Sequence, residues 1–252
     1  MKSFLHKKGV SLSPRVYFID GLSFMALGLF SSLIIGLIIK TIGDQAGWTF
    51  FTDMGILAMS LMGPAIGAAV AFGLKAPPLV LFSAIIAGAA GAQLGGPAGS
   101  FVAALLATEV GKMVSKETKV DILVTPFLTI LTGFLVATFI GPPINAGMNS
   151  LGSLIMWATE QQPIVMGILV AVLMGWALTA PISSAAIALM LGLEGIAAGA
   201  ATIGCAAQMV GFAVSSYREN KMAGLLALGI GTSMLQVPNV IRNPLIIIPP
   251  TI

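Results

Sequence analysis

Between Asp121 and Arg218 the sequence carries only two charged residues, Glu160 and Glu194. Over the whole chain of 252 residues, 8% are charged and 57% are apolar, whereas a soluble domain has about 25% charged residues. A water-soluble fold could not cover its surface with so few charges. Disorder is excluded as well, because disordered chains are poor in apolar residues. The composition therefore predicts a helical protein that crosses a membrane several times.

Runs of apolar residues show where the chain would cross a bilayer, since an α-helix needs about 20 residues to span the hydrocarbon region. Four runs approach this length, at residues 21–39, 122–140, 163–179 and 196–214. Five others are shorter or interrupted, at residues 54–74, 79–94, 98–110, 182–193 and 222–235. We therefore expect an all-α polytopic membrane protein with about seven to nine transmembrane or half-spanning helices.

Glycine and proline interrupt these runs at residues 63–64, 95–97, 141–143 and 180–181. In membrane proteins such breaks are typical of re-entrant or discontinuous helices that line a transport site. Residues 144–162, which follow the third break, have mixed polarity with apolar residues at helical spacing. We expect them to form an amphipathic helix along the membrane interface, with Trp157 as its anchor.

A weak internal repeat relates two of the breaks at an offset of 117 residues, since Leu61 and Pro64 match Leu178 and Pro181. Several alanines that follow also match. A true repeat would place broken helices at equivalent positions in two halves, which points to a binding site. Chance matching in a sequence rich in alanine and leucine is the alternative.

Nine of the twelve positive charges lie in an N-terminal tail and in two short loops between apolar runs. They are Lys2, Lys7, Lys8 and Arg15 in the tail, Lys112, Lys116 and Lys119 in one loop, and Arg218 and Lys221 in another. This distribution follows the positive-inside rule, and it leaves no basic face for nucleic acid. We expect residues 1–20 to be a cytoplasmic tail and residues 21–252 to be one multi-pass domain of the cell membrane.

The sequence offers no constellation for covalent catalysis. Its one histidine, His6, lies in the basic tail, and its one cysteine, Cys205, lies in an apolar stretch. A catalytic triad or a zinc site needs more of these residue types than the chain contains. We therefore expect no catalytic residue, no metal site and no cofactor.

Polar residues at membrane depth are the candidates for a binding site, because each is costly in hydrocarbon and tends to face a cavity. Those near the breaks or at the ends of spans are Gln93, Glu109, Asn145, Thr179, Ser183, Ser184 and Glu194. Amides and hydroxyls of this kind suit a small polar solute. The alternative is structural, since serine and threonine often bond their own helix backbone or join packed helices.

Two stretches of the sequence resemble a known family. Residues 119–130 (Lys-Val-Asp-Ile-Leu-Val-Thr-Pro-Phe-Leu-Thr-Ile) and 140–151 (Ile-Gly-Pro-Pro-Ile-Asn-Ala-Gly-Met-Asn-Ser-Leu) resemble the IIC component of phosphotransferase-system sugar permeases, closest to the fructose-type branch. Residues 174–186 and 195–214 are similar to a divergent subfamily that includes perfringolysin regulatory proteins. The resemblance covers most of the chain after residue 26.

The resemblance implies a homodimeric membrane permease for a small polar solute, in particular a sugar. Any phosphotransferase activity would need separate IIA and IIB proteins, with IIB docking near residues 112–119. The chain departs from the family pattern in two ways. Residues 177–181 lack the acidic residue of the fructose-type motif. Members of the family are also usually longer, so we expect a last span to be missing. The alternative is a membrane-bound regulator or sensor that keeps the IIC fold without phosphotransfer.

Overall fold

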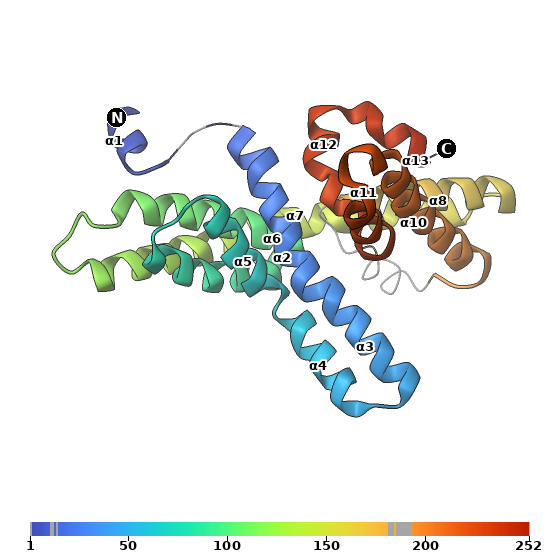
Figure 1. Cartoon of the computed structure of the whole chain (residues 1–252), viewed down its shortest axis with the longest axis horizontal. Coiled ribbons are helices and arrows are strands. Elements are labelled where there is room, and N and C mark those ends of the chain that lie inside the picture. The colour runs from blue at the N-terminus through green and yellow to red at the C-terminus, as the bar shows by residue number, and fades with distance from the viewer. Residues whose placement is uncertain (1, 11–12, 14, 181–183, 185–192, 252) are drawn as a thin grey trace. The chain divides into compact units, whose positions relative to one another are not determined.

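The computed structural model describes residues 2–10, 13, 15–180, 184 and 193–251, and all regular elements in these ranges are helical (Figure 1). Four helical stretches are long and apolar enough to cross a membrane: Leu22–Ala46, Pro78–Val114, Asp121–Gly147 and Gly195–Ser215. A bent pair, Thr49–Ser60 with Met62–Gly73, would add a fifth, and Pro163–Thr179 is a shorter apolar helix. The all-α polytopic membrane class is therefore confirmed.

The chain forms two compact units, Met1–Asn145 (unit 1) and Ala146–Ile252 (unit 2). Unit 1 begins with α1 (Lys2–Lys7), η1 (Val16–Gly21), α2 (Leu22–Leu29), η2 (Phe30–Ile34), α3 (Ile35–Ala46), α4 (Thr49–Ser60) and α5 (Met62–Gly73). The chain reverses at Gly47, whose φ of 69° suits glycine. From there α4 and α5 run back along α3 and α2, with a bend of 50° between α4 and α5. The span is interrupted as expected, but the bend lies at Leu61, and Gly63 and Pro64 belong to the first turn of α5.

Glycines let these helices approach closely, as is common in membrane proteins. A Cβ on Gly28 of α2 would lie only 2.8 Å from the carbonyl oxygen of Ala65 in α5. A Cβ on Gly36 of α3 would lie 2.9 Å from the carbonyl oxygen of Gly55 in α4. The long hairpin from residue 22 to residue 73 is thus held by contacts that larger side chains would prevent.

The helix α6 (Pro78–Val114) is itself a hairpin, because Gly95 and Gly96 leave the helical conformation. Gly96 has a φ of 60°, which glycine adopts without strain. Its two arms pack along each other: a Cβ on Gly99 would lie 2.5 Å from the carbonyl oxygen of Gly91, and one on Gly111 would lie 2.8 Å from Val80 Cγ1. The expected break at residues 95–97 is confirmed, and the chain returns to the end of unit 1 from which it came.

We expect Gly67→Ala to lower the free energy of unfolding by about 1–3 kcal/mol, the usual cost of overpacking. A Cβ on Gly67 of α5 would collide with the carbonyl oxygen of Ala84 in α6, so the two backbones would have to separate. The matched control is Gly167→Ala in α8 (Pro163–Thr179), where nothing lies within 4 Å of the added carbon. That change should be neutral or stabilise the helix by up to about 1 kcal/mol. Unfolding of both variants in mixed micelles, followed by circular dichroism, checks the difference; equal effects would contradict it.

The helix α7 (Asp121–Thr159) shows that the expected break at residues 141–143 is wrong. The chain stays helical through Pro142 and Pro143 and on to Thr159, but the stretch that could cross a membrane ends at Gly147. An amphipathic helix along the membrane interface after this point stays a prediction. Proline has a φ that a helix accepts, although it removes an N–H donor and crowds the preceding turn. Membrane helices tolerate this because neighbouring groups satisfy the freed backbone carbonyl. Gly141 is fixed by packing, since a Cβ there would lie 2.8 Å from Cβ of Leu94.

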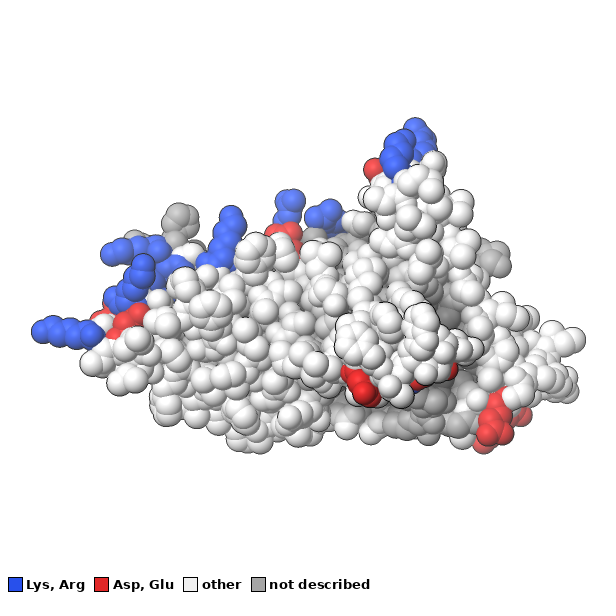
Figure 2. Space-filling view, turned by 60° about the horizontal axis from the view of Figure 1, so that its bottom comes forward, with Lys and Arg blue, Asp and Glu red and all other residues white. Residues whose placement is uncertain are grey.

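Side-chain bonds gather three segments at one end of unit 1. Lys8 Nζ donates to the carbonyl oxygen of Ser115 at 2.5 Å and pairs with Glu117. Lys112 Nζ donates to the carbonyl oxygen of Leu74 at 3.0 Å. The tail, the loop at residues 74–77 and the loop at residues 115–120 therefore form one surface, here called the basic end. In Figure 2 Lys and Arg side chains line one edge of unit 1, above a broad uncharged surface.

Unit 2 contains α8, α10 (Gly195–Ser215), α11 (Tyr217–Leu226), η3 (Ala227–Gly231), η4 (Ser233–Gln236), α12 (Val237–Arg242), η5 (Pro244–Ile247) and α13 (Ile248–Thr251). Its core is formed where α8 packs on α10, through buried residues such as Val170, Met174 and Ala201. Gly204 lies directly against the backbone of Ala171. The α8 helix ends at Thr179, and the next residue, Ala180, is extended.

Candidate functional site

Five polar side chains from four helical elements of unit 2 form a hydrogen-bonded network, here called the Gln208 cluster. Gln208 Nε2 donates to Thr179 Oγ1 at 3.2 Å, and Thr179 Oγ1 lies 2.9 Å from Ser233 Oγ. Thr251 Oγ1 lies 3.3 Å from Gln208 Oε1, and Trp176 Nε1 donates to Thr251 Oγ1 at 3.0 Å. The side chains of Thr179, Gln208 and Ser233 are at most 3% exposed. Such a network inside an apolar bundle is costly unless its groups are paired.

Helix ends position two members of this cluster. Thr179 is the last residue of α8, and Ser233 begins η4 directly after Thr232, which is extended and caps η4 by accepting from Met234 N. Gln208 projects from the middle of α10, where Gly204 and Ala171 bring α8 close. Breaks in the helices therefore bring polar groups from separate segments together in the interior of unit 2.

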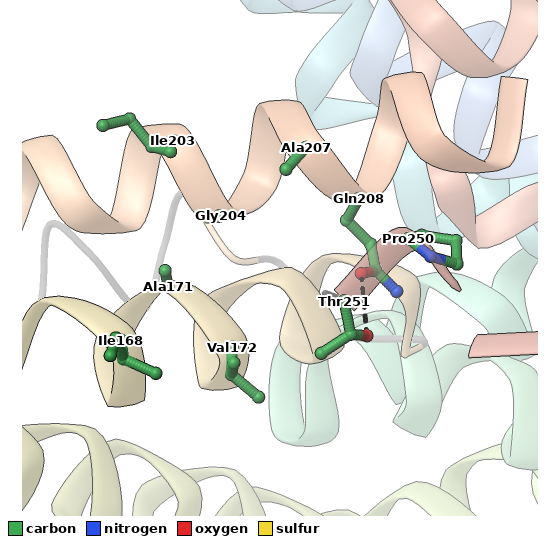
Figure 3. Close-up of a pocket in the computed structure, with 9 residues that line it drawn as sticks. All are labelled: Ile168, Ala171, Val172, Ile203, Gly204, Ala207, Gln208, Pro250 and Thr251. Carbon is green, nitrogen blue, oxygen red and sulfur yellow. Dashed lines mark hydrogen bonds between the residues drawn. The ribbon is translucent and has the colours of Figure 1, made fainter. Parts of the chain in front are cut away.

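A cavity of about 220 Å³ opens beside the cluster, between α8, α10 and α13 (Figure 3). Its polar side chains are those of Gln208 and Thr251; its other lining residues are Ile168, Ala171, Val172, Ile203, Gly204, Ala207 and Pro250. None of the described residues that line it is charged. The cavity thus presents one amide and one hydroxyl within an apolar wall, a composition typical of small-molecule sites.

The amide oxygen of Gln208 is able to accept a further hydrogen bond. The hydroxyl of Thr251 has one proton and two acceptors within reach, the carbonyl oxygen of Ile247 at 2.7 Å and Gln208 Oε1 at 3.3 Å. The shorter bond takes the proton, since a hydroxyl donates only once. Gln208 Oε1 is therefore weakly bonded and can accept a hydrogen bond from a ligand hydroxyl.

The residues predicted from the sequence fall in different places. In unit 2, Thr179 belongs to the Gln208 cluster. Ser184 is buried and lines a separate cavity of about 410 Å³ together with Cys205. Glu194 is exposed at the N-cap of α10, and Ser183 lies outside the described residues.

In unit 1, Gln93 is exposed just before the tip of the α6 hairpin, and Asn145 is exposed on α7. Glu109 is buried and pairs with Lys112, whose Nζ lies 3.3 Å from Glu109 Oε1. That contact gives Glu109 a structural partner. The binding roles of Gln93, Asn145, Glu109, Ser184 and Glu194 stay predictions.

Thr179 is the one member of the cluster among the predicted site residues; Gln208, Trp176, Ser233 and Thr251 were not predicted. The last two come from short helices near the C-terminus, Ser233 from η4 and Thr251 from α13. Both lie far along the chain from their partners, 54 residues from Thr179 for Ser233 and 43 residues from Gln208 for Thr251. Proximity to a break could have indicated Ser233, which follows Gly229 and Gly231. No local signal distinguishes Thr251.

Metal binding has no support in the described part of the chain, where no group of three or more His, Cys, Asp or Glu side chains could hold an ion. The cluster consists of one neutral amide, three hydroxyls and an indole. These groups can bind and orient a polar molecule by hydrogen bonding.

The fold and the site define a polytopic α-helical membrane protein with an uncharged, mostly apolar cavity that carries one amide and one hydroxyl. A family model described as "Phosphotransferase system, EIIC" matches residues 19–252. The chain belongs to this family and is therefore a membrane permease component of a phosphotransferase system. The resemblance to IIC components is confirmed, whereas the fructose-type and perfringolysin-regulator likeness stays a prediction. No curated protein and no solved structure matches the chain.

Proposed function

We propose that the chain moves a sugar or a similar polyhydroxylated solute across the cell membrane, and that Gln208 and Thr251 bind it. The single observation that supports this is the neutral, partly unsatisfied amide of Gln208 at a cavity of about 220 Å³. Sugar hydroxyls both donate and accept hydrogen bonds, so an amide oxygen and a threonine hydroxyl match them. An uncharged lining favours a neutral solute, because an ion would lose its hydration without gaining a partner.

We also propose that the basic end faces the cytoplasm and receives a separate IIB phosphocarrier protein. Its exposed cations come from three segments that hydrogen bonds hold together. They are Lys7, Arg15, Lys75, Lys116 and Lys119. Positive loops are retained on the cytoplasmic side, and a concentrated basic surface attracts a partner of opposite charge. A homodimer, as the family resemblance implies, is part of the same proposal.

A panel of sugars and polyols tests the proposed solute. A ligand that binds the folded state at 100 times its Kd should raise the free energy of unfolding by about 2.7 kcal/mol. We expect at least one sugar to raise the melting temperature of the purified protein, and to be taken up by cells that produce the chain together with a IIB protein. No stabilisation by any sugar and no uptake would contradict the proposal.

A membrane-bound sensor is the second candidate function, favoured by the neutral Thr179 in the stretch where fructose-type permeases carry an acidic residue. A sensor could keep the binding cavity without coupling it to phosphotransfer. The same experiment separates the two functions: sugar binding without uptake, combined with altered transcripts after gene deletion, would favour the sensor.

A further inference from the structure

Unit 1 carries an apolar groove of about 670 Å³ on its surface, formed by α2, η2, α5 and the first arm of α6. Its floor lies where Gly28 of α2 meets Ala65 and Ala69 of α5. Larger side chains rise beside it, among them Phe24 and Phe72. All three helical stretches that form it, Leu22–Ala46, the bent pair ending at Gly73 and Pro78–Val114, are candidate membrane spans. The groove therefore lies at a depth where the surrounding solvent is hydrocarbon.

The side chains that line the groove offer no free hydrogen-bond donor to an occupant. Ser31 is the polar residue in its lining, and its hydroxyl already donates to the carbonyl oxygen of Gly28 at 3.1 Å. No charged side chain is present among the described residues that line it. A polar solute would lose its hydration there without compensation, so the occupant must be apolar over the length of the groove.

One end of the groove lies at the basic end of unit 1. Phe72 and Leu81 line the groove and flank the loop at residues 74–77. Lys75 in this loop is exposed, and its backbone N–H donates to the carbonyl oxygen of Phe72 at 2.9 Å. The backbone of an exposed cationic residue is therefore bonded to Phe72, one of the residues that line this uncharged groove. This is the charge arrangement of a lipid with an anionic headgroup and an apolar tail.

The aromatic residues at this mouth favour a flexible chain over a helix. The rings of Phe24 on α2 and Phe72 on α5 meet edge to face, with centroids 6.0 Å apart. They close the space between the two helices at this point. An α-helix with its side chains is about 10–12 Å wide and would have to displace both rings, whereas an acyl chain can bend around them.

We propose that the groove binds an acyl chain of an anionic phospholipid, with the phosphate of the headgroup held by Lys75. The lipid is a ligand distinct from the transported solute, because its site lies in unit 1 and the Gln208 cluster lies in unit 2. Basic residues near a membrane surface attract anionic lipids, and burial of the tail against Ala65 and Ala69 adds apolar contact.

Native mass spectrometry of the delipidated full-length chain, titrated with dioleoyl phosphatidylglycerol or dioleoyl phosphatidylcholine, tests the site. Ala68→Leu adds a larger side chain inside the groove and should weaken binding of both lipids roughly tenfold. Its control is the same substitution at an exposed alanine of α7, Ala146→Leu, which should change neither. Lys75→Gln should weaken the binding of phosphatidylglycerol about fivefold and leave that of phosphatidylcholine unchanged.

Lys116→Gln is the matched control for the headgroup, because Lys116 is also an exposed lysine with a positive φ at the basic end. The proposal is overturned if Lys75→Gln and Lys116→Gln reduce phosphatidylglycerol binding equally, or if Ala68→Leu leaves lipid binding unchanged. A change of oligomeric state in Ala68→Leu with unaltered lipid affinity would also overturn it and would assign the groove to a second copy of the chain. Lys75 is on the surface, so Lys75→Gln tests the site even if Ala68→Leu fails to fold.

Discussion

Gln208→Leu is expected to weaken binding of the transported solute by about 10- to 100-fold, the effect of leaving buried hydrogen-bonding groups unpaired. Leucine is similar in size to glutamine but has no amide. The change removes both the acceptor that faces the cavity and the donor to Thr179. The measurement is the Kd of the sugar that gives the largest thermal shift with the unaltered protein.

Two further variants separate binding from stability. Gln162→Leu replaces an exposed glutamine before α8 and should leave the Kd unchanged. Gln208→Asn keeps an amide on a shorter side chain and should give an intermediate Kd. If Gln208→Leu lowers the melting temperature while the Kd of the folded fraction stays the same, Gln208 is a packing residue and the proposed site is wrong.

Lys112→Ala is expected to lower the free energy of unfolding by about 3–5 kcal/mol, because it leaves a buried acid without its partner. The side chains of Lys112 and Glu109 are only 3% and 9% exposed. Glu109 Oε2 already has no hydrogen-bond partner, so Lys112 supplies the remaining compensation. The carbonyl oxygen of Leu74 also loses its donor. Unfolding in mixed micelles of detergent and denaturant measures the change.

The double variant Glu109→Gln/Lys112→Met should recover most of this loss, since replacing both members of a buried ion pair is often close to neutral. Lys40→Ala is the control for an exposed pair. Lys40 and Asp44 bond at 2.5 Å but their side chains are 35% and 42% exposed, so little change is expected. A double variant as unstable as Lys112→Ala would show that the instability does not come from an unpaired charge.

The helix breaks show which part of the fold a sequence can predict. Apolar run lengths define most of the spans, and Gly95-Gly96 ends a helix because Gly96 takes a positive φ. The similar motif at residues 141–143 does not break the chain, since Gly141 keeps a helical conformation against Leu94. Proline alone restricts φ without reversing the chain. Whether a glycine leaves the helix is decided by neighbours that the local sequence does not reveal.

The candidate site was predictable only in part, because it too depends on contacts between residues that are distant in the sequence. Thr179 could be identified because it directly precedes a break, and polar residues at broken helices are often exposed to cavities. Its partners Ser233 and Thr251 come from short helices near the C-terminus, and only tertiary packing brings them to Gln208. A network assembled from distant segments leaves no periodic pattern in the sequence.

The hairpin in α6 has a consequence for how the sidedness of the protein is mapped. If membrane spans are counted by helix length and hydropathy, Pro78–Val114 is one crossing of the bilayer. Such a count would place the start of α7 on the opposite side of the membrane. The bond between Lys112 and the carbonyl oxygen of Leu74 shows instead that both arms end together. Reporter fusions after residue 76 and after residue 117 should therefore report the same compartment. The left-handed conformation of a single glycine, Gly96, thus helps to determine on which side of the bilayer α7 begins.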